Sequence, residues 1–248
     1  SLWSVRNCFE KNDFAALDAF LAYFQNTMLQ MRDSRLPVIA APVGMSIGGG
    51  FEVVLHADHV VSHANSVMGL VESFVGVVPA GGGCKEMLYR WIEKLNDTQK
   101  GVWKSFMNIG LGVKANSPQE AGAFSMRRTD DVFQMNRDRI LNIALSSLDD
   151  TKKAGKRSPL ALSGSQHFQE MLEWLEVNNK KGILTSHDVT VGTEIGRIMS
   201  GGDCPAGTVF SEQEILNAER SSFIELAQTQ ETQARIVSML DNGITLRN

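Results

Sequence analysis

Three consecutive glycines and two glutamates form the most informative pattern in the chain. Gly48, Gly49 and Gly50 follow an apolar run, and Glu52 stands in the first turn of the helix that we expect next. Because glycine has no Cβ, a ligand can approach its backbone closely. A helix start adds unpaired N–H groups and the positive end of its dipole, which suit an oxygen that develops negative charge. Glu72 follows later in the chain, so two carboxyls could perform acid–base chemistry beside an activated carbonyl.

The same residues also have simpler explanations. A glycine triplet before a helix is often only a tight turn, and the helix dipole favours a glutamate in the first turn whatever its function. Glu72 could be a solvated loop residue. The spacing alone therefore leaves the catalytic and the structural interpretation open.

The elements around these residues are predicted to form an α/β core. Val38–Val43 is apolar on both faces, which is typical of a covered strand. Val60–Ser62 and Val67–Leu70 read as a strand pair joined by a turn. A buried helix is expected over Glu52–Ala57, and Pro79–Gly83 opens another over Cys84–Lys94. We expect the first amides of this second helix to face the same pocket as Glu72.

The remaining elements are predicted to be helices. Asp13 can cap a helix whose apolar stripe runs from Phe14 to Met31. Ser117 and Ser211 each begin a capping-box pattern, and Gly243 ends a helix as an αL cap would. The other predicted helices cover residues 98–109, 136–148, 166–178, 185–199, 215–227 and 231–240, and residues 149–165 resemble a linker.

The composition of the chain argues against several classes of function. The 248 residues are 43% hydrophobic with a net charge of −4, and they contain no basic tract, so nucleic-acid binding is not expected. No apolar run reaches the ~20 residues needed to span a bilayer, so we expect no membrane insertion. Cys8, Cys84 and Cys204 are far apart and odd in number, which favours reduced thiols in the cytoplasm. His56 and its neighbours lack cysteine partners, so no metal site is expected.

The glycine–glutamate segment resembles the crotonase superfamily, and within it the enoyl-CoA hydratases. The matching words are PVIAAPVG-x-SIGGGFE, then HADHVV, then MGLVE-x-FVGVVPAGGG. The resemblance implies an α/β crotonase-like spiral core over residues 1–125, which carries the acid/base pair, and a mainly helical C-terminal region over residues 126–248. The core is expected to be partial, without its N-terminal strands.

The resemblance also implies roles for individual residues. Gly49 would supply an oxyanion-hole amide, and Glu52 and Glu72 would be the catalytic acid/base pair. Gly48, Gly50, Pro79, Ala80 and Gly81 would line the substrate site. Ala80 stands where many hydratases have glycine, a change that keeps the backbone amide. The implied reaction is syn addition of water to a trans-2-enoyl-CoA, giving a 3-hydroxyacyl-CoA without any cofactor.

The C-terminal words MNRDR, SGGDCPAGT and GITLRN carry a second resemblance. They are similar to the end of large bacterial fatty-acid-oxidation proteins, which have a 3-hydroxyacyl-CoA dehydrogenase part first and a hydratase part last. This resemblance implies a role in beta-oxidation, and it implies NAD only in a dehydrogenase part outside these residues. The chain is then expected to form a homo-oligomer or to dock on that part.

One expected feature of the family is missing from these residues. The second oxyanion amide comes from an A-G-A-D/N-like loop, and Leu2-Trp3 aligns just after it. We therefore expect an N-terminally truncated chain with little or no activity, because one lost donor typically costs about a hundred- to a thousand-fold in turnover. Two alternatives stay open. The chain could be a non-catalytic acyl-CoA-binding or assembly module, or an enoyl-CoA isomerase of the same superfamily.

Overall fold

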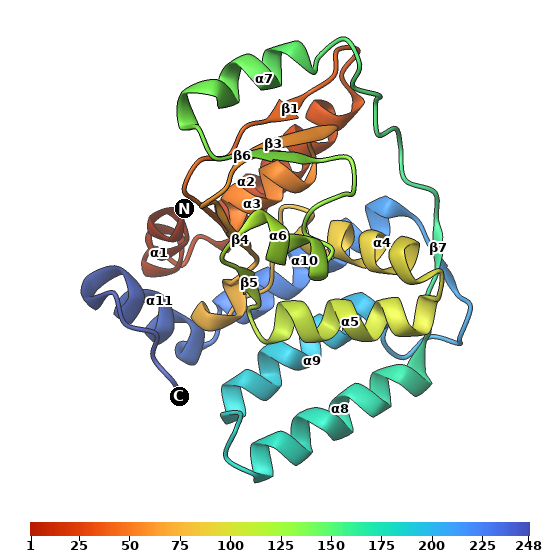
Figure 1. Ribbon diagram of the computed structural model, residues 1–248. Coiled ribbons are helices and arrows are strands. Elements are labelled where there is room, and N and C mark those ends of the chain that lie inside the picture. Colours follow the sequence, from red (N-terminus) through yellow and green to blue (C-terminus); the bar gives the residue numbers. More distant parts are fainter.

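Two small sheets carry the site-bearing part of the chain. The computed structural model describes all 248 residues. In the first sheet, β3 (His59–His63) lies between β1 (Ile39–Ala40) and β6 (Val132–Gln134), and all three are parallel. In the second, β4 (Val67–Gly69) lies between the parallel β2 (Met45–Ile47) and the antiparallel β5 (Lys114–Ala115). The fold is a mixed α/β arrangement followed by a mainly helical region (Figure 1).

The predicted pairing of the strands at 60–62 and 67–70 was wrong. The two strands exist as β3 and β4, but each belongs to a different sheet. The backbone between them explains why. The amide of Ala64 donates to the carbonyl oxygen of Gln134, the last residue of β6, whereas the amide of Val67 donates to the carbonyl oxygen of Gly44, just before β2. The turn therefore passes the chain from one sheet to the other.

The first strand is shorter and more open than predicted. Only Ile39–Ala40 is paired, because β1 is an edge strand and Pro42, which follows closely, has no N–H to continue a ladder. Val43 is 38% exposed and Met45 is 71% exposed. The expectation of a strand covered on both faces over Val38–Val43 was therefore wrong.

Most of the predicted helices are present. In the first half these are α2 (Phe14–Asp33), α3 (Gly49–Leu55), α4 (Gly83–Leu95), α5 (Thr98–Gly110) and α6 (Pro118–Ala123). The helix α1 (Leu2–Glu10) and the 3-10 turn η1 (Glu72–Val75) were not predicted. Asp13 caps α2 by accepting from the amide of Ala16. Ser117 caps α6, but Glu120 turns back to the amide of Asn116, so only half of that capping box forms.

The C-terminal region is built from four longer helices. The 3-10 turn η2 (Arg137–Arg139) and α7 (Ile140–Ser146) precede them, and the short strands β7 (Leu160–Ala161) and β8 (Val209–Phe210) form an antiparallel pair. The helices are α8 (Ser165–Lys180), α9 (Ser186–Ser200), α10 (Glu212–Ala227) and α11 (Gln230–Asn242). Thr185 and Ser211 form complete capping boxes, and Gly243 ends α11 in the left-handed conformation. None of the helices combines the length and apolar character that a bilayer span requires.

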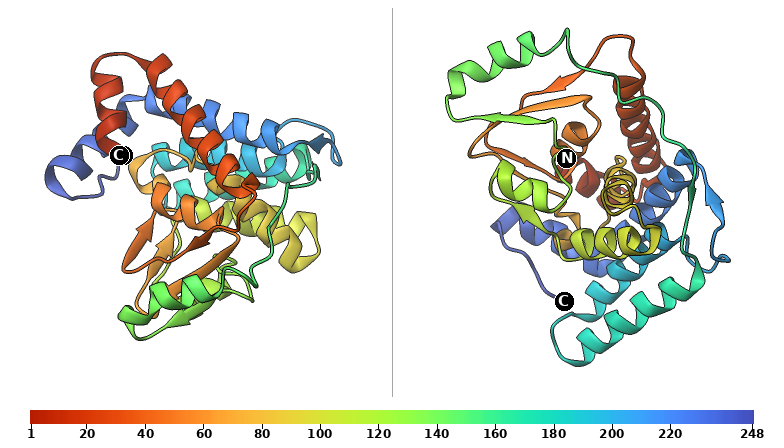
Figure 2. Two further views of the ribbon diagram at one scale, coloured as in Figure 1. Left: turned by 90° about the horizontal axis from the view of Figure 1, so that it is seen from above. Right: turned by 45° about the vertical axis from the view of Figure 1, so that its right-hand side comes forward.

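The C-terminal helices pack on the site-bearing part. The main core cluster includes Leu17 of α2, Phe51 of α3, Phe106 of α5, Ile195 of α9 and Ile236 of α11. In Figures 1 and 2, α11 lies beside α1, and the side chain of Arg6 bonds to Asp241 at 2.6 Å. Residues far apart in the sequence therefore share one apolar interior.

Candidate active site

One cavity of about 900 Å³ gathers nearly all of the predicted site residues. Its polar wall contains Gly48, Gly49, Gly50, Glu52, Glu72, Ala80 and Gly81. Its apolar wall includes Phe20 and Phe24 of α2 and Phe223 of α10. Pro79 is buried and is not part of the lining; it packs beside Gly83, where an added Cβ would lie 2.8 Å from Cβ of Pro79.

Glu52 lines this cavity and is almost fully buried. Its Oε1 accepts hydrogen bonds from the amides of Gly81 at 2.7 Å and Gly83 at 2.8 Å. Its Oε2 points toward Gly49, where an added Cβ would lie 3.8 Å away. Burial raises the pKa of Glu52 to about 7, although the two amides and the charge of Lys85 act in the opposite direction. One oxygen is thus fixed and the other faces the cavity.

Glu72 approaches the same place from η1. An added Cβ on Gly48 would lie 3.3 Å from Oε1 of Glu72. The carboxyls of Glu72 and Glu52 therefore lie beside the neighbouring glycines Gly48 and Gly49. Its Oε2 is buried without a hydrogen-bond partner. Burial, and then the charge of Glu52, raise the pKa of Glu72 to about 8. A proton is therefore held more tightly by Glu72 than by Glu52.

The start of α3 leaves amides open beside the two carboxyls. Gly48 adopts φ +56°, a conformation that favours glycine, and its amide donates to the carbonyl oxygen of Gly69. The amides of Phe51 and Glu52 both donate to Gly48. Gly49 holds the first helical position, where an amide has no partner within its helix. Its N–H is therefore placed to donate to an oxygen in the cavity.

The amides at the start of α4 are used differently from the prediction. We expected them to face the pocket, but carboxyl groups of the protein occupy them. Glu52 binds the amides of Gly81 and Gly83, and Glu219 of α10 binds those of Gly82 at 2.8 Å and Lys85 at 2.6 Å. Glu219 is 0% exposed. Sequence reasoning missed it, although a glutamate on the apolar face of a helix, between Ile215 and Phe223, was a visible signal.

A buried ionic network lies behind α4. Lys85 is 0% exposed, and its Nζ contacts His56 Nε2 at 2.9 Å, Glu86 at 2.9 Å and Glu212 at 2.8 Å. Because His56 Nδ1 bonds to the carbonyl oxygen of Glu52 at 2.7 Å, that nitrogen carries the proton and Nε2 accepts from Lys85. Burial lowers the pKa of His56 to about 4, so the ring is neutral. The network anchors the backbone of Glu52.

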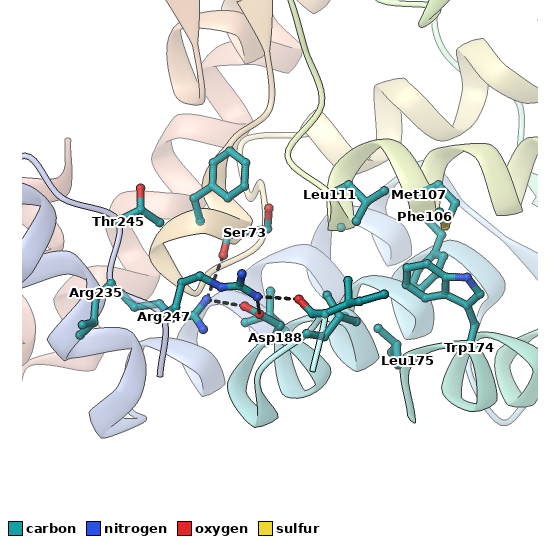
Figure 3. A pocket seen from close by; sticks show the side chains of 17 residues that line it. Ser73, Phe106, Met107, Leu111, Trp174, Leu175, Asp188, Arg235, Thr245 and Arg247 are labelled. Carbon is teal, nitrogen blue, oxygen red and sulfur yellow. Dashed lines mark hydrogen bonds and ion pairs between the residues drawn. The ribbon is translucent and has the colours of Figure 1, made fainter. Parts of the chain in front are cut away.

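The C-terminal helices hold the turn that carries Glu72. Thr232 of α11 donates from its hydroxyl to the carbonyl oxygen of Gly76, at the end of η1. Arg235 of α11 bonds to the carbonyl oxygen of Ser73 at 3.4 Å and to Asp188 of α9 at 2.8 Å, as Figure 3 shows. The position of Glu72 thus depends on residues near the other end of the chain.

This arrangement has the parts needed to add or remove a proton next to a carbonyl. The two carboxyls differ in their affinity for a proton. The one with the lower affinity can act as the base, and the other can act as the acid. The amide of Gly49 can stabilise an oxygen that becomes negative. No group of three or more histidine, cysteine, aspartate or glutamate side chains is arranged to hold a metal ion.

The segment that contains these residues matches a known family. Residues 8–96 match the enoyl-CoA hydratase/isomerase family. An enoyl-CoA hydratase structure from Rhodobacter sphaeroides aligns with a TM-score of 0.66 at 16% identity, covering 100% of this chain and 74% of that one. A carnitinyl-CoA dehydratase structure from Mycobacterium thermoresistibile also gives 0.66, at 14% identity, covering 98% of this chain and 72% of that one.

Two curated relatives are much longer. The "Probable 3-hydroxyacyl-CoA dehydrogenase" of Bacillus subtilis is 31% identical over 243 residues, which are 96% of this chain and 31% of that protein. The "Putative fatty acid oxidation complex trifunctional enzyme" of Rickettsia prowazekii is 26% identical over 232 residues, which are 90% of this chain and 28% of that protein. This chain therefore spans less than a third of either relative.

The overall fold of the chain agrees with the family match. The fold is that of the enoyl-CoA hydratase structures, and the family match covers all of α2, α3, η1 and α4. Residues 8–96 thus carry the match to the enoyl-CoA hydratase/isomerase family, and the chain has the crotonase-like fold.

Proposed function

We propose that this chain carries an enoyl-CoA hydratase site, which adds water to a trans-2-enoyl-CoA to give a 3-hydroxyacyl-CoA. The observation that carries the proposal is the meeting of Glu52 and Glu72 in one cavity beside the amide of Gly49. A site with two carboxyls can hold one water and protonate the neighbouring carbon, whereas a shift of a double bond within a substrate consumes no water.

The bonds of the two carboxyls assign them different roles. Glu52 accepts two amide bonds, which favour its ionised form, so it is the base that takes a proton from water while the oxygen attacks Cβ. Glu72, whose buried oxygen lacks a partner, is the acid that gives its proton to Cα. Gly49 N–H donates to the thioester oxygen as the enolate-like charge develops. Glu52 then holds a proton and Glu72 lacks one, and exchange with solvent restores the starting state.

The apolar wall of the cavity supports an acyl-CoA substrate. Phe20, Phe24 and Phe223 can cover the hydrocarbon part of an acyl chain, while the glycines receive the thioester. No cofactor takes part in this reaction. The names of the relatives support a role in fatty-acid oxidation beside a 3-hydroxyacyl-CoA dehydrogenase, which would use NAD outside this chain.

Assembly and location belong to the same proposal. The exposed apolar side chains of α7 and α8, among them Leu141, Leu145 and Val177, suit contacts with a second copy or with a dehydrogenase part. Cys8, Cys84 and Cys204 are free thiols, which suits the reducing cytoplasm.

The test is a hydration assay with crotonyl-CoA on the natural protein that carries these residues. We expect the conjugated thioester to disappear and a 3-hydroxybutyryl-CoA to form, detected by mass spectrometry. A 3-enoyl-CoA is the second substrate. Conversion of the 3-enoyl-CoA without hydration of crotonyl-CoA would identify an isomerase. Binding of both thioesters with no turnover would identify a non-catalytic acyl-CoA-binding module.

A further inference from the structure

Two carboxyl groups share the start of α4, and only one of them faces the cavity. Counting along the chain, the amides of Gly81 and Gly83 donate to Glu52, and those of Gly82 and Lys85 donate to Glu219. Each carboxyl thus takes amides that alternate with those of the other. Gly82, with φ +100°, allows the backbone to turn its amide away from those of its neighbours.

This turn is held from three helices. Glu52 belongs to α3 and Glu219 to α10, while Gln25 of α2 donates from Nε2 to the carbonyl oxygens of Ala80 at 2.9 Å and of Leu216 at 2.8 Å. Gln25 therefore ties the turn to the same helix that presents Glu219. If the amide of Gly82 lost its acceptor, it would be a buried donor without a partner, and the turn would have to move.

Both carboxyl oxygens of Glu219 are engaged in hydrogen bonds with the backbone. Each accepts one backbone amide, and the side chain is 0% exposed, so it cannot contact a substrate. Glu52 uses only Oε1 for amides and keeps Oε2 for the cavity. Glu52 is thus the member of the pair that can exchange a proton with substrate, and Glu219 is the member that stays fixed.

We propose that Glu219 is a positioning residue for Glu52: it fixes the Gly81–Gly83 turn that binds Glu52, and its nearby charge links the protonation of the two carboxyls. This inference rests on the proposed hydratase site, because Glu52 is its base. It adds a residue from the C-terminal helices to a site whose two carboxyls lie within residues 8–96, the segment that matches the family.

The charges around the pair are consistent with this link. Burial and then the charge of Glu52 raise the pKa of Glu219, and two such close carboxyls titrate as a pair. The titratable groups that face the pair are Lys85 and Cys84 of α4, Glu72 of η1, His56 just after α3, and Glu212 of α10. Lys85 is the nearest cation, and its charge lowers the pKa of both Glu52 and Glu219.

The test combines a titration with kinetics. Glutamate labelled with 13C at Cδ is introduced, and the Glu52 signal is assigned with Glu52→Gln. In Glu219→Gln we expect the Glu52 midpoint to rise, because movement of the turn weakens the amide bonds that lower the pKa of Glu52. In Glu52→Gln the Glu219 signal, assigned with Glu219→Gln, should titrate at a pH lower by roughly one unit or more, because the carboxylate that raises its pKa is removed. Turnover of crotonyl-CoA should fall about tenfold to a hundredfold while KM changes little, since the base is displaced. Glu225→Gln, an exposed change on the same helix, should alter neither.

A second variant separates position from charge. Glu219→Asp keeps the charge but is too short to reach both amides, so turnover should fall and the Glu52 midpoint should rise as in Glu219→Gln. An unchanged Glu52 midpoint in Glu219→Gln, or an unchanged Glu219 midpoint in Glu52→Gln, would overturn the proposal. If Glu219→Gln does not fold, the titration of the wild type tests the proposal instead. The Glu52 and Glu219 signals should then titrate in two coupled steps, and independent single steps would overturn the proposal. Because the titration needs no turnover, it is decisive even if the protein hydrates nothing.

Discussion

The hydroxyl of Thr232 donates a hydrogen bond of 2.7 Å to the carbonyl oxygen of Gly76, 156 residues earlier in the chain. That hydroxyl also contacts Nε2 of His187 at 2.8 Å, and since its proton goes to Gly76, the histidine must donate. Thr232 is 0% exposed. A C-terminal helix therefore fixes the turn whose first residue is Glu72.

Thr232→Val tests this relationship. The change keeps the shape of the side chain but leaves the carbonyl oxygen of Gly76 and the ring N–H of His187 buried without a partner. We expect the free energy of unfolding to fall by roughly 1–3 kcal/mol, measured by denaturant titration. Thr190→Val, an exposed change on α9, is the control and should have little effect. Equal effects of the two substitutions would show that the hydroxyl of Thr232 is not needed.

Gly81→Ala tests the close packing of the turn. A Cβ at this position would lie 2.2 Å from Cε1 of Phe24 and 2.6 Å from Oε2 of Glu52. We expect a loss of about 1–3 kcal/mol in stability from overpacking, together with reduced turnover, since Glu52 must move. Gly110→Ala is the control, because nothing lies within 4 Å of its added Cβ. A Gly81→Ala protein with unchanged stability and turnover would contradict the described geometry.

The dependence of activity on pH should be bell-shaped. The mechanism needs Glu52 ionised and Glu72 protonated at the same time. Burial raises the pKa of Glu52 to about 7 and that of Glu72 to about 8. Activity should therefore rise as Glu52 loses its proton and fall as Glu72 loses its own, giving a narrow optimum in kcat/KM between them. A flat profile across neutral pH would exclude this assignment of roles.

Glu72 also makes stability depend on pH. Its folded-state pKa, about 8, is above the ordinary value of 4.5, so the folded protein binds a proton more tightly than the unfolded chain does. This contribution is fully present below the ordinary value and is lost as pH rises toward the folded value. Glu72→Gln should therefore become more stable relative to the wild type between about pH 5 and about pH 8, by roughly 1–3 kcal/mol.

Thermal and denaturant unfolding at several pH values measure this difference. Glu173→Gln, an exposed change on α8, supplies the baseline, and its difference from the wild type should not change with pH. A difference for Glu72→Gln that shrinks as pH rises would have the wrong sign for a buried carboxyl.

Local signals predicted much of the fold. Asp13, Thr185, Ser211 and Gly243 act at helix ends, where the side chain or backbone bonds within a few residues of itself. Those helix boundaries were therefore readable from short stretches of sequence. The glycine triplet also predicted a local feature, the turn before a helix. Gly48 adopts a positive φ there, immediately before α3.

Long-range contacts could not be predicted in the same way. The strand partners of β3 and β4 depend on Gln134 and Gly44, which no local pattern connects to them. Glu219 reaches Gly82 across 137 positions, so its role emerges only when α10 packs against the start of α4. The signal for Glu219 was its place on an apolar helix face, which marks a buried acid but does not name its partner.

The most direct test of the central claim compares the wild type with Glu52→Gln, Glu72→Gln and the double variant in crotonyl-CoA hydration. Because both carboxyls act on one water, each single variant should lose about a hundredfold or more in kcat, with little change in KM. The double variant should be hardly worse than the poorer single one, since the two groups act as a unit. Turnover at the wild-type rate in both single variants would contradict the account.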